Sequence, residues 1–144
     1  MKLTRRPAED ADKAFVQDAN RAAYEDVVVR QFGQWDEAFH EYHFNKKWED
    51  ATFEIVESRS GPVGALWTTD EGDHLWLREV FLLPVFQGQG IGTALIRQEL
   101  AKARRFKKPL RLRVLRENRA LSLYERLGFS VCGETETHFL MEAV

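Results

Sequence analysis

The stretch that decides the fold lies in the middle of the chain and reads Val80-Phe81-Leu82-Leu83-Pro84-Val85-Phe86-Gln87-Gly88-Gln89-Gly90-Ile91-Gly92-Thr93. It joins an apolar, strand-like run to a segment whose apolar residues have helical spacing. Glycines at alternate positions let backbone N–H groups face one concavity at a helix N-terminus, where the helix dipole adds about half a positive charge. The stretch therefore predicts a phosphate-binding loop, and the alternative is a glycine turn that serves only strand–helix packing.

Two common phosphate-binding loops do not fit this stretch. A Walker loop needs a lysine followed by Ser or Thr after its last glycine, whereas Thr93 follows Gly92 directly. A dinucleotide fingerprint needs Gly-x-Gly-x-x-Gly, and here the third glycine comes one position early. That fingerprint also needs a carboxylate about 20 residues further on, where residues Lys108 to Leu112 supply none. Nucleotide hydrolysis and dinucleotide binding are both disfavoured.

Outward from this loop, the apolar spacing alternates between the strand period and the helical period. Turn signals separate the segments, with Pro62 and Gly72 in two of them. The spacing predicts strands over 2–6, 52–57, 63–69, 74–83, 110–115, 129–133 and 137–142, and helices over 10–33, 35–48, 91–106 and 120–127. This order is typical of a mixed α/β fold with hairpins at both ends, and it differs from a repeating Rossmann pattern.

Length and composition restrict the class of protein. The chain has 144 residues, of which 44% are hydrophobic and 31% charged, as in an ordinary globular domain. No apolar run approaches the roughly 18 residues of a spanning helix, and the first residues lack the apolar core of a signal peptide. Cys132 is the single cysteine, which excludes an internal disulfide and a cysteine-rich zinc site. We expect a cytoplasmic protein that neither spans nor binds a membrane.

Charge is distributed unevenly along the chain. The basic stretch, Arg97 to Arg119, carries ten Lys or Arg against two Glu, so its balance is +8 and the rest of the chain carries −10. Such a stretch is a nucleic-acid surface, a site for a small polyanion, or a solvated helix face. Because the negative remainder would repel a duplex, a small anionic ligand fits better than nucleic acid.

Three motifs together resemble the GNAT superfamily of acyl-CoA-dependent N-acyltransferases. Gln87-x-x-Gly90-x-Gly92, preceded by a strand and a proline, is similar to the family's acyl-CoA pyrophosphate loop. Asn118, Ala120 and the run Leu123 to Phe129 resemble its second signature, and Gly61-Pro62-Val63-Gly64 resembles its third-strand entry. One departure is that Arg119 alone separates Asn118 from Ala120, where the family usually has two residues.

The resemblance implies a single GNAT-like α/β domain over residues 1–144, with a mixed central β-sheet of about seven strands flanked by about four helices. It implies acetyl-CoA as cosubstrate, with pantetheine running along the strand before the loop and the pyrophosphate on the loop amides. The basic stretch would then receive the 3′-phosphate. The implied cofactor-binding residues are Val80, Phe81, Leu82, Gln87, Gly88, Gln89, Gly90, Ile91, Gly92, Thr93, Asn118 and Tyr124.

The same resemblance implies acetyl transfer to a primary amine by direct attack in a ternary complex. An alkylammonium with a pKa near 10.4 must lose a proton at pH 7, at a cost of about 4.6 kcal/mol, so a nearby carboxylate helps. Glu79 interrupts an apolar strand and is the candidate base; the alternative is an ion pair with an arginine across the sheet. The Leu82 amide would meet the oxyanion. Tyr124 matches the family's tyrosine that protonates the CoA thiolate, and the alternative is a packed core tyrosine.

The resemblance implies an acceptor pocket in the region of the first two helices. Tyr24, Phe32 and Trp35 lie in the region that shapes the family's acceptor pocket, and acidic neighbours would attract a cation. A polyamine, an amino acid, an aminoglycoside-like drug, or a protein N-terminus or lysine all remain open. His40 and His43 are three residues apart rather than four, so we expect no metal. Two further hypotheses are a non-catalytic CoA-binding sensor and, ranked last, a nucleic-acid-binding protein; relatives suggest a possible homodimer.

Overall fold

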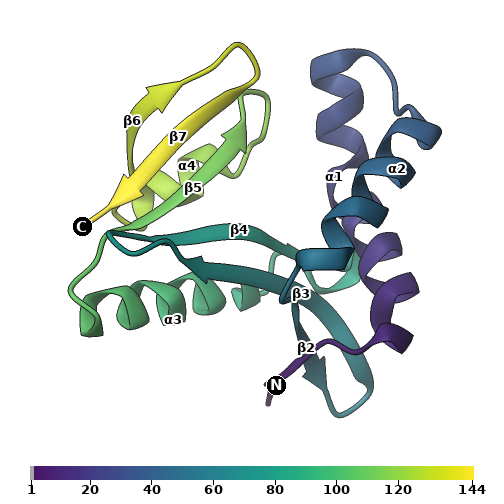
Figure 1. The fold of residues 1–144 in the computed structure, drawn as a ribbon, viewed down its shortest axis with the longest axis horizontal. Coiled ribbons are helices and arrows are strands. Elements are labelled where there is room, and N and C mark those ends of the chain that lie inside the picture. The colour runs from purple at the N-terminus through teal and green to yellow at the C-terminus, as the bar shows by residue number, and fades with distance from the viewer. Residues whose placement is uncertain (1) are drawn as a thin grey trace. The chain divides into compact units, whose positions relative to one another are not determined.

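The computed structural model describes residues 2–144, and each predicted strand and helix has a counterpart in it (Figure 1). The elements are β1 (Thr4–Pro7), η1 (Asp10–Asp12), α1 (Lys13–Phe32), α2 (Glu37–Asp50), β2 (Glu54–Ser58), β3 (Gly61–Asp70), β4 (Leu75–Leu82), η2 (Pro84–Phe86), α3 (Ile91–Arg105), β5 (Leu110–Leu115), α4 (Leu121–Arg126), β6 (Ser130–Glu134) and β7 (His138–Ala143). The predicted α/β class, with seven strands and four α-helices in residues 2–144, is confirmed.

The second helix begins later than its aromatic spacing predicts. Asp36 is the N-cap, and its side chain accepts a hydrogen bond from the Phe39 amide at 3.1 Å. A carboxylate at this position satisfies one of the four free amides of a first helical turn. Trp35 therefore precedes α2 rather than starting it, and the helix continues past Trp48 to Asp50.

The strands form one mixed sheet in the order β1-β2-β3-β4-β5-β7-β6. The pairs β1/β2, β2/β3, β5/β7 and β6/β7 are antiparallel. The pair β4/β5 is parallel, with Leu75 opposite Leu110 and Leu77 opposite Leu112. A parallel pair requires a crossover connection, and α3 supplies it.

The chain groups into two compact units. The first unit comprises the residues up to Trp67 together with Glu79–Gln87, and the second comprises Thr68–Arg78 and Gly88–Val144. In the first unit, one face of α1 buries Val16 and Ala19 against Phe53, Ile55 and other residues of its core. This core also contains Phe44, Ala65 and Phe81, which places α1, α2 and the end of β4 in one packed body.

The second unit has its own apolar interior. Helix α3 buries Ile91, Leu95 and Leu100 on one face, as its spacing predicts. Strand β5 buries Leu110, Leu112 and Val114 and directs the arginines between them outward, which is the period-two pattern of a strand. Each of these elements therefore has one apolar face that folding removes from water.

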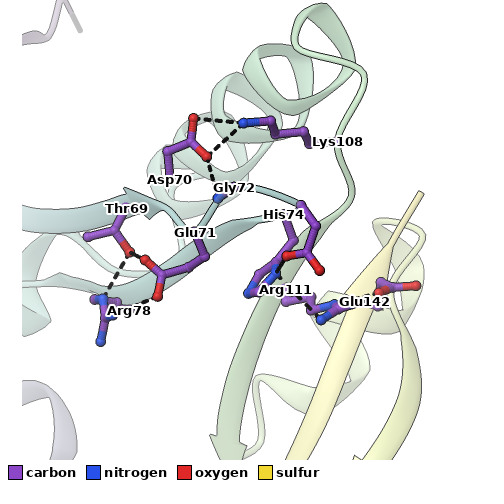
Figure 2. A network of polar contacts seen from close by, with 10 residues as sticks. Thr69, Asp70, Glu71, Gly72, His74, Arg78, Lys108, Arg111 and Glu142 are labelled. Carbon is purple, nitrogen blue, oxygen red and sulfur yellow. Dashed lines mark hydrogen bonds and ion pairs between the residues drawn. The ribbon is translucent and has the colours of Figure 1, made fainter.

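Polar contacts fix the tip of the β3–β4 hairpin within the second unit (Figure 2). The Lys108 ammonium donates to both carboxylate oxygens of Asp70 at 2.8 and 2.9 Å, and Asp70 also accepts from the Gly72 amide. The hydrogen bond from Lys108 lowers the pKa of the Asp70 carboxyl from its ordinary value. On the same hairpin Arg78 donates to Thr69 and Glu71.

Within residues 2–144, no helix has the length and apolar character of a membrane-spanning segment.

Candidate active site

Two glycines of the loop before α3 have a left-handed backbone. Gly88 has a φ of 75° and Gly90 a φ of 81°, both left-handed, and a Cβ added to either would meet no atom within 4 Å. Glycine is therefore required by backbone conformation rather than by crowding. Gly90 is the N-cap of α3, which has no side-chain cap, and its carbonyl accepts the Ala94 amide at 3.0 Å. The first-turn amides of Ile91, Gly92 and Thr93 thus have no acceptor within the helix, which is the arrangement that suits an anion at a helix N-terminus.

Successive backbone carbonyls at the end of β4 point to opposite sides of the strand. The Phe81 carbonyl faces β3, since a Cβ added to Gly64 would lie within 2.3 Å of it. The Val80 carbonyl accepts a hydrogen bond from the Tyr24 hydroxyl at 3.0 Å, and the Leu82 carbonyl accepts one from Gln87 Nε2 at 3.1 Å. Both carbonyls that do not face β3 are therefore held by side chains of the first unit. Gln87, predicted as a loop ligand, ties the loop's start to β4.

Glu79 lies in an ion pair that the sequence does not reveal. Lys47 Nζ on α2 donates to Glu79 Oε1 at 2.5 Å. The Glu79 side chain is 14% exposed and that of Lys47 36%. The ion pair expected as the alternative to catalysis is therefore present, with Lys47 of α2 as the cation in place of an arginine across the sheet. The role of Glu79 as base stays a prediction. Glu79 is thus a sheltered carboxylate whose charge is already matched by a primary ammonium.

Tyr124 lies on α4 in the second unit and is 9% exposed. Its ring meets that of Phe129 edge to face, with centroids 5.8 Å apart. Its carbonyl accepts the Phe129 amide at 3.0 Å, which fixes the turn after the helix. The predicted role as proton donor stays a prediction, beside a clear packing role.

Asn118 has a local structural task. Its Oδ1 accepts the Ala120 amide at 2.9 Å, and its backbone carbonyl accepts the Leu121 amide at 3.2 Å. The shortened spacing noted in the sequence is what brings Asn118 Oδ1 to Ala120, in an Asx turn that starts α4. The side-chain oxygen is therefore engaged within the chain, and cofactor binding by Asn118 stays a prediction.

The three predicted acceptor residues have different surroundings. The Tyr24 ring packs edge to face on Phe81, with its hydroxyl on β4. Phe32, at the end of α1, is 51% exposed. Trp35 stacks on His40 with ring centroids 3.8 Å apart. Of the three, only Trp35 is among the residues that line a groove between α1 and α2.

This α1–α2 groove has a volume of about 300 Å³ and lies within the first unit. Its lining carries both signs of charge and two imidazoles; the residues are Gln17, Asp18, Asn20, Arg21, Trp35, Glu37, His40, Glu41, His43, Phe44 and Lys47. Burial lowers the pKa of the His40 imidazole below its ordinary value. Within residues 2–144 no three His, Cys, Asp or Glu side chains are grouped so that they could hold a metal ion. His40, Phe44 and Lys47 recur at helical spacing in the sequence, and this spacing indicates that they share one face of α2.

The basic stretch is divided among several ion pairs in the second unit. Lys108 binds Asp70, and Arg111 Nε donates to Glu142 at 2.6 Å (Figure 2). Arg116 donates to the Thr135 carbonyl at 2.6 Å and lies 3.4 Å from Glu134. These three cations stabilise the fold, whereas Arg97, Arg104 and Arg105 on α3 are exposed.

A mixed α/β sheet with a glycine loop at an uncapped helix start defines a class of protein suited to an anionic ligand at that helix. The family model described as acetyltransferase (GNAT) domain matches residues 49–131, and the chain belongs to this family. The resemblance seen in the sequence is thereby confirmed, and acetyl-CoA is the cosubstrate of this class of enzyme. No curated protein sequence matches the chain.

Solved structures with the same fold cover nearly the whole chain. A PaiA N-acetyltransferase from Thermoplasma acidophilum, solved with coenzyme A, is 19% identical with a TM-score of 0.80, and 99% of each chain is covered. The apo form of YjaB from Escherichia coli is 17% identical with a TM-score of 0.77, covering 100% of this chain and 99% of that one. The ribosomal-protein-S18-alanine N-acetyltransferase from Escherichia coli is 19% identical with a TM-score of 0.71, covering 99% and 93%.

Proposed function

We propose that residues 1–144 act as one N-acetyltransferase domain that moves an acetyl group from acetyl-CoA to a primary amine by direct attack within a ternary complex. The observation that carries this is the loop of left-handed glycines at the uncapped start of α3. The first-turn amides of α3 and the helix dipole suit a pyrophosphate. The likeness to a coenzyme A complex from Thermoplasma acidophilum supports the same ligand.

In this proposal each residue has one task. The amides of Gly88 to Thr93 hold the pyrophosphate, and the backbone of Val80 to Leu82 aligns the pantetheine, with the Leu82 amide meeting the oxyanion. Glu79 accepts a proton from the amine, directly or through water. Tyr124 returns a proton to the departing thiolate. Because Lys47 already neutralises Glu79, a cationic acceptor has to replace that ammonium before its own proton can pass to Glu79.

Two observations favour a second candidate function, a CoA-binding sensor without turnover. The candidate base is in an ion pair, and Tyr124 is buried against Phe129. Tyr124→Phe distinguishes the two functions, because an enzyme would lose kcat with nearly unchanged coenzyme A affinity. A sensor has no turnover for the substitution to lower.

The first test is thermal unfolding with acetyl-CoA, coenzyme A, and ATP as a polyphosphate control. A ligand at about 100 times its Kd stabilises by roughly 2.7 kcal/mol, which raises the midpoint by a few degrees. A rise with both coenzyme A species and not with ATP supports the proposal. No rise with any of them overturns it and leaves the loop as a packing turn.

A matched pair of variants assigns that rise to the loop. Gly90→Ala and Gly72→Ala both force alanine into a left-handed φ, of 81° and 96° respectively, with no steric clash. Each should cost about 1 kcal/mol of folding stability. Only Gly90→Ala should also weaken the acetyl-CoA response, because Gly72 lies in the β3–β4 turn. Equal responses in the two variants would place the ligand elsewhere.

A further inference from the structure

A primary amine of the chain already occupies the position that an acceptor amine has to reach. Lys47 Nζ lies 2.5 Å from Glu79 Oε1, within hydrogen-bond distance for proton transfer. The carboxylate is sheltered, at 14% exposed, while the lysine side chain is 36% exposed and lines the α1–α2 groove. Lys47 therefore connects the groove to the candidate base.

We propose that Lys47 is an internal acceptor, so that the chain acetylates its own Lys47 when acetyl-CoA is bound. The inference rests on the proposed function, because it needs the thioester beside β4 and Glu79 as the base. It goes beyond that function by naming a modified residue within the chain. Every protein group it uses lies in the first unit, on α2 and β4.

The reaction balances with acetyl-CoA as the only co-reactant. The Lys47 ammonium passes one proton to Glu79, and the neutral nitrogen attacks the thioester carbonyl carbon. A C–N bond forms and the C–S bond breaks, with its electron pair leaving on sulfur. The second proton, lost from nitrogen as the amide forms, neutralises the thiolate, and Glu79 releases its proton to water. The products are acetyl-Lys47, coenzyme A and one proton.

The neighbouring lysine shows why Lys47 is favoured. Lys46 Nζ lies 5.3 Å from the centre of the Tyr42 ring, and its side chain is exposed. Acetyl-CoA from solution can reach Lys46, but among residues 2–144 no carboxylate is paired with that amine. Lys47 has a flexible four-carbon stem that can carry its amine from Glu79 toward an adjacent thioester. Lys46 therefore serves as an internal reference, because it reports the acetylation rate of a neighbouring lysine without the help of Glu79.

The experiment incubates the purified full chain with acetyl-CoA and follows acetylation of each lysine by peptide mass spectrometry. We expect Lys47 to react at least about tenfold faster than Lys46, since a general base typically contributes 10²- to 10⁴-fold. The rate constant should not change when the protein is diluted, because the amine and the base belong to one chain. Glu79→Gln should reduce the Lys47 rate toward that of Lys46.

Two further variants serve as controls. Lys47→Arg preserves the cation beside Glu79 and cannot be acetylated, so it should remove the modification without unfolding the chain. Lys46→Arg should leave Lys47 acetylation unchanged. Circular dichroism and the acetyl-CoA thermal response of each variant verify that it is folded and binds the cosubstrate.

Each result decides the inference. Equal rates at Lys46 and Lys47, or a Lys47 rate unaffected by Glu79→Gln, would overturn it in favour of spontaneous acetylation. An unmodified Lys47 in a chain that binds acetyl-CoA or acetylates an added amine would overturn the inference and leave the proposed function standing. A chain that gives no thermal response to acetyl-CoA would overturn both.

Discussion

At Gly64 the neighbouring backbone leaves no room for a side chain. A Cβ at this position would lie 2.3 Å from the Phe81 carbonyl oxygen and 3.0 Å from the Leu82 Cα, both backbone atoms. Backbone cannot move aside as a flexible side chain can, so β3 or β4 would have to shift. We expect Gly64→Ala to lower the free energy of unfolding by at least about 2 kcal/mol, measured by urea denaturation.

Gly133→Ala is the matched control for that substitution. An added Cβ there would meet the Leu140 side chain at 3.5 Å, an ordinary van der Waals distance. We expect a change within about 1 kcal/mol. A comparable loss in both variants would show that glycine is needed in these strands for a reason other than the close approach of β3 and β4.

Lys107 is the one non-glycine residue with a positive φ, 56°, among residues 2–144. It follows α3, where its amide donates to the Arg104 carbonyl and the Lys108 amide donates to the Ala103 carbonyl. These two bonds are a Schellman motif, whose left-handed position favours glycine. We expect Lys107→Gly to raise the free energy of unfolding by about 1 kcal/mol in urea denaturation.

Arg104→Gly tests the position dependence of that gain. Arg104 is exposed and helical in the last turn of the same helix. Glycine there should lower stability by about 1 kcal/mol. If both glycines lower stability, the left-handed strain at Lys107 is relieved by contacts of its side chain.

The sequence predicted part of the candidate site and missed the rest for a physical reason. Gly88 and Gly90 were identifiable because a left-handed backbone favours glycine, and glycine is visible in the sequence. Glu79 was identifiable because it interrupts an apolar strand. Lys47 was not, since its contact with Glu79 spans 32 residues and depends on how α2 lies against β4. Helical spacing gives the face of a helix and not the element that this face meets.

At the scale of elements, a partly exposed ion pair ties β1 to η1. Arg6 donates to both carboxylate oxygens of Asp12 at 2.7 and 2.8 Å, and Asp12 also accepts the Glu9 amide. The bond from Arg6 lowers the pKa of Asp12 from its ordinary 3.8 to about 2. Folding therefore favours the ionised carboxyl, so its stabilisation is present above pH 3.8 and is lost as the pH falls from there through about 2.

We expect this carboxylate to contribute about 1 kcal/mol, a value reduced because Arg6 is partly exposed to solvent. The measurement is the difference in urea stability between the wild-type chain and Asp12→Asn, at neutral pH and at about pH 3. The difference should shrink at the lower pH, because Asp12 of the unfolded chain is then mostly protonated while the folded chain still holds it ionised. A difference that stays constant between the two conditions would mean that Asp12 acts through packing rather than charge.

The elements were predictable from spacing, whereas their arrangement was not. Period-two alternation located β5 through Leu110, Leu112 and Val114, and helical spacing located α3. The strand order β5-β7-β6, in which the last strand lies between the other two, arises from pairing across long stretches of chain. Local spacing contains no information on such pairing. The start of α2 was misplaced because aromatic spacing continues into the residues before its cap, Asp36.

At the scale of the whole molecule, the uneven charge separates two classes of ligand. The basic stretch carries +8 and the rest of the chain −10. Lys108, Arg111 and Arg116 already have acidic partners within the fold. The cations that remain exposed suit the few phosphates of one coenzyme A better than the long phosphate backbone of a duplex.

We therefore expect a labelled DNA duplex to show no measurable binding in fluorescence anisotropy at physiological salt, under conditions where acetyl-CoA raises the unfolding midpoint. The negative remainder of the chain repels a long polyanion, and three of the ten cations are engaged in ion pairs. The titration is repeated between about 50 and 200 mM salt, because six or more phosphate contacts would cost about 10³-fold in affinity over that range. Duplex binding with such a steep decline would assign the basic stretch to nucleic acid. If acetyl-CoA binds and the duplex does not, the result supports a small anionic ligand for the exposed part of the basic stretch.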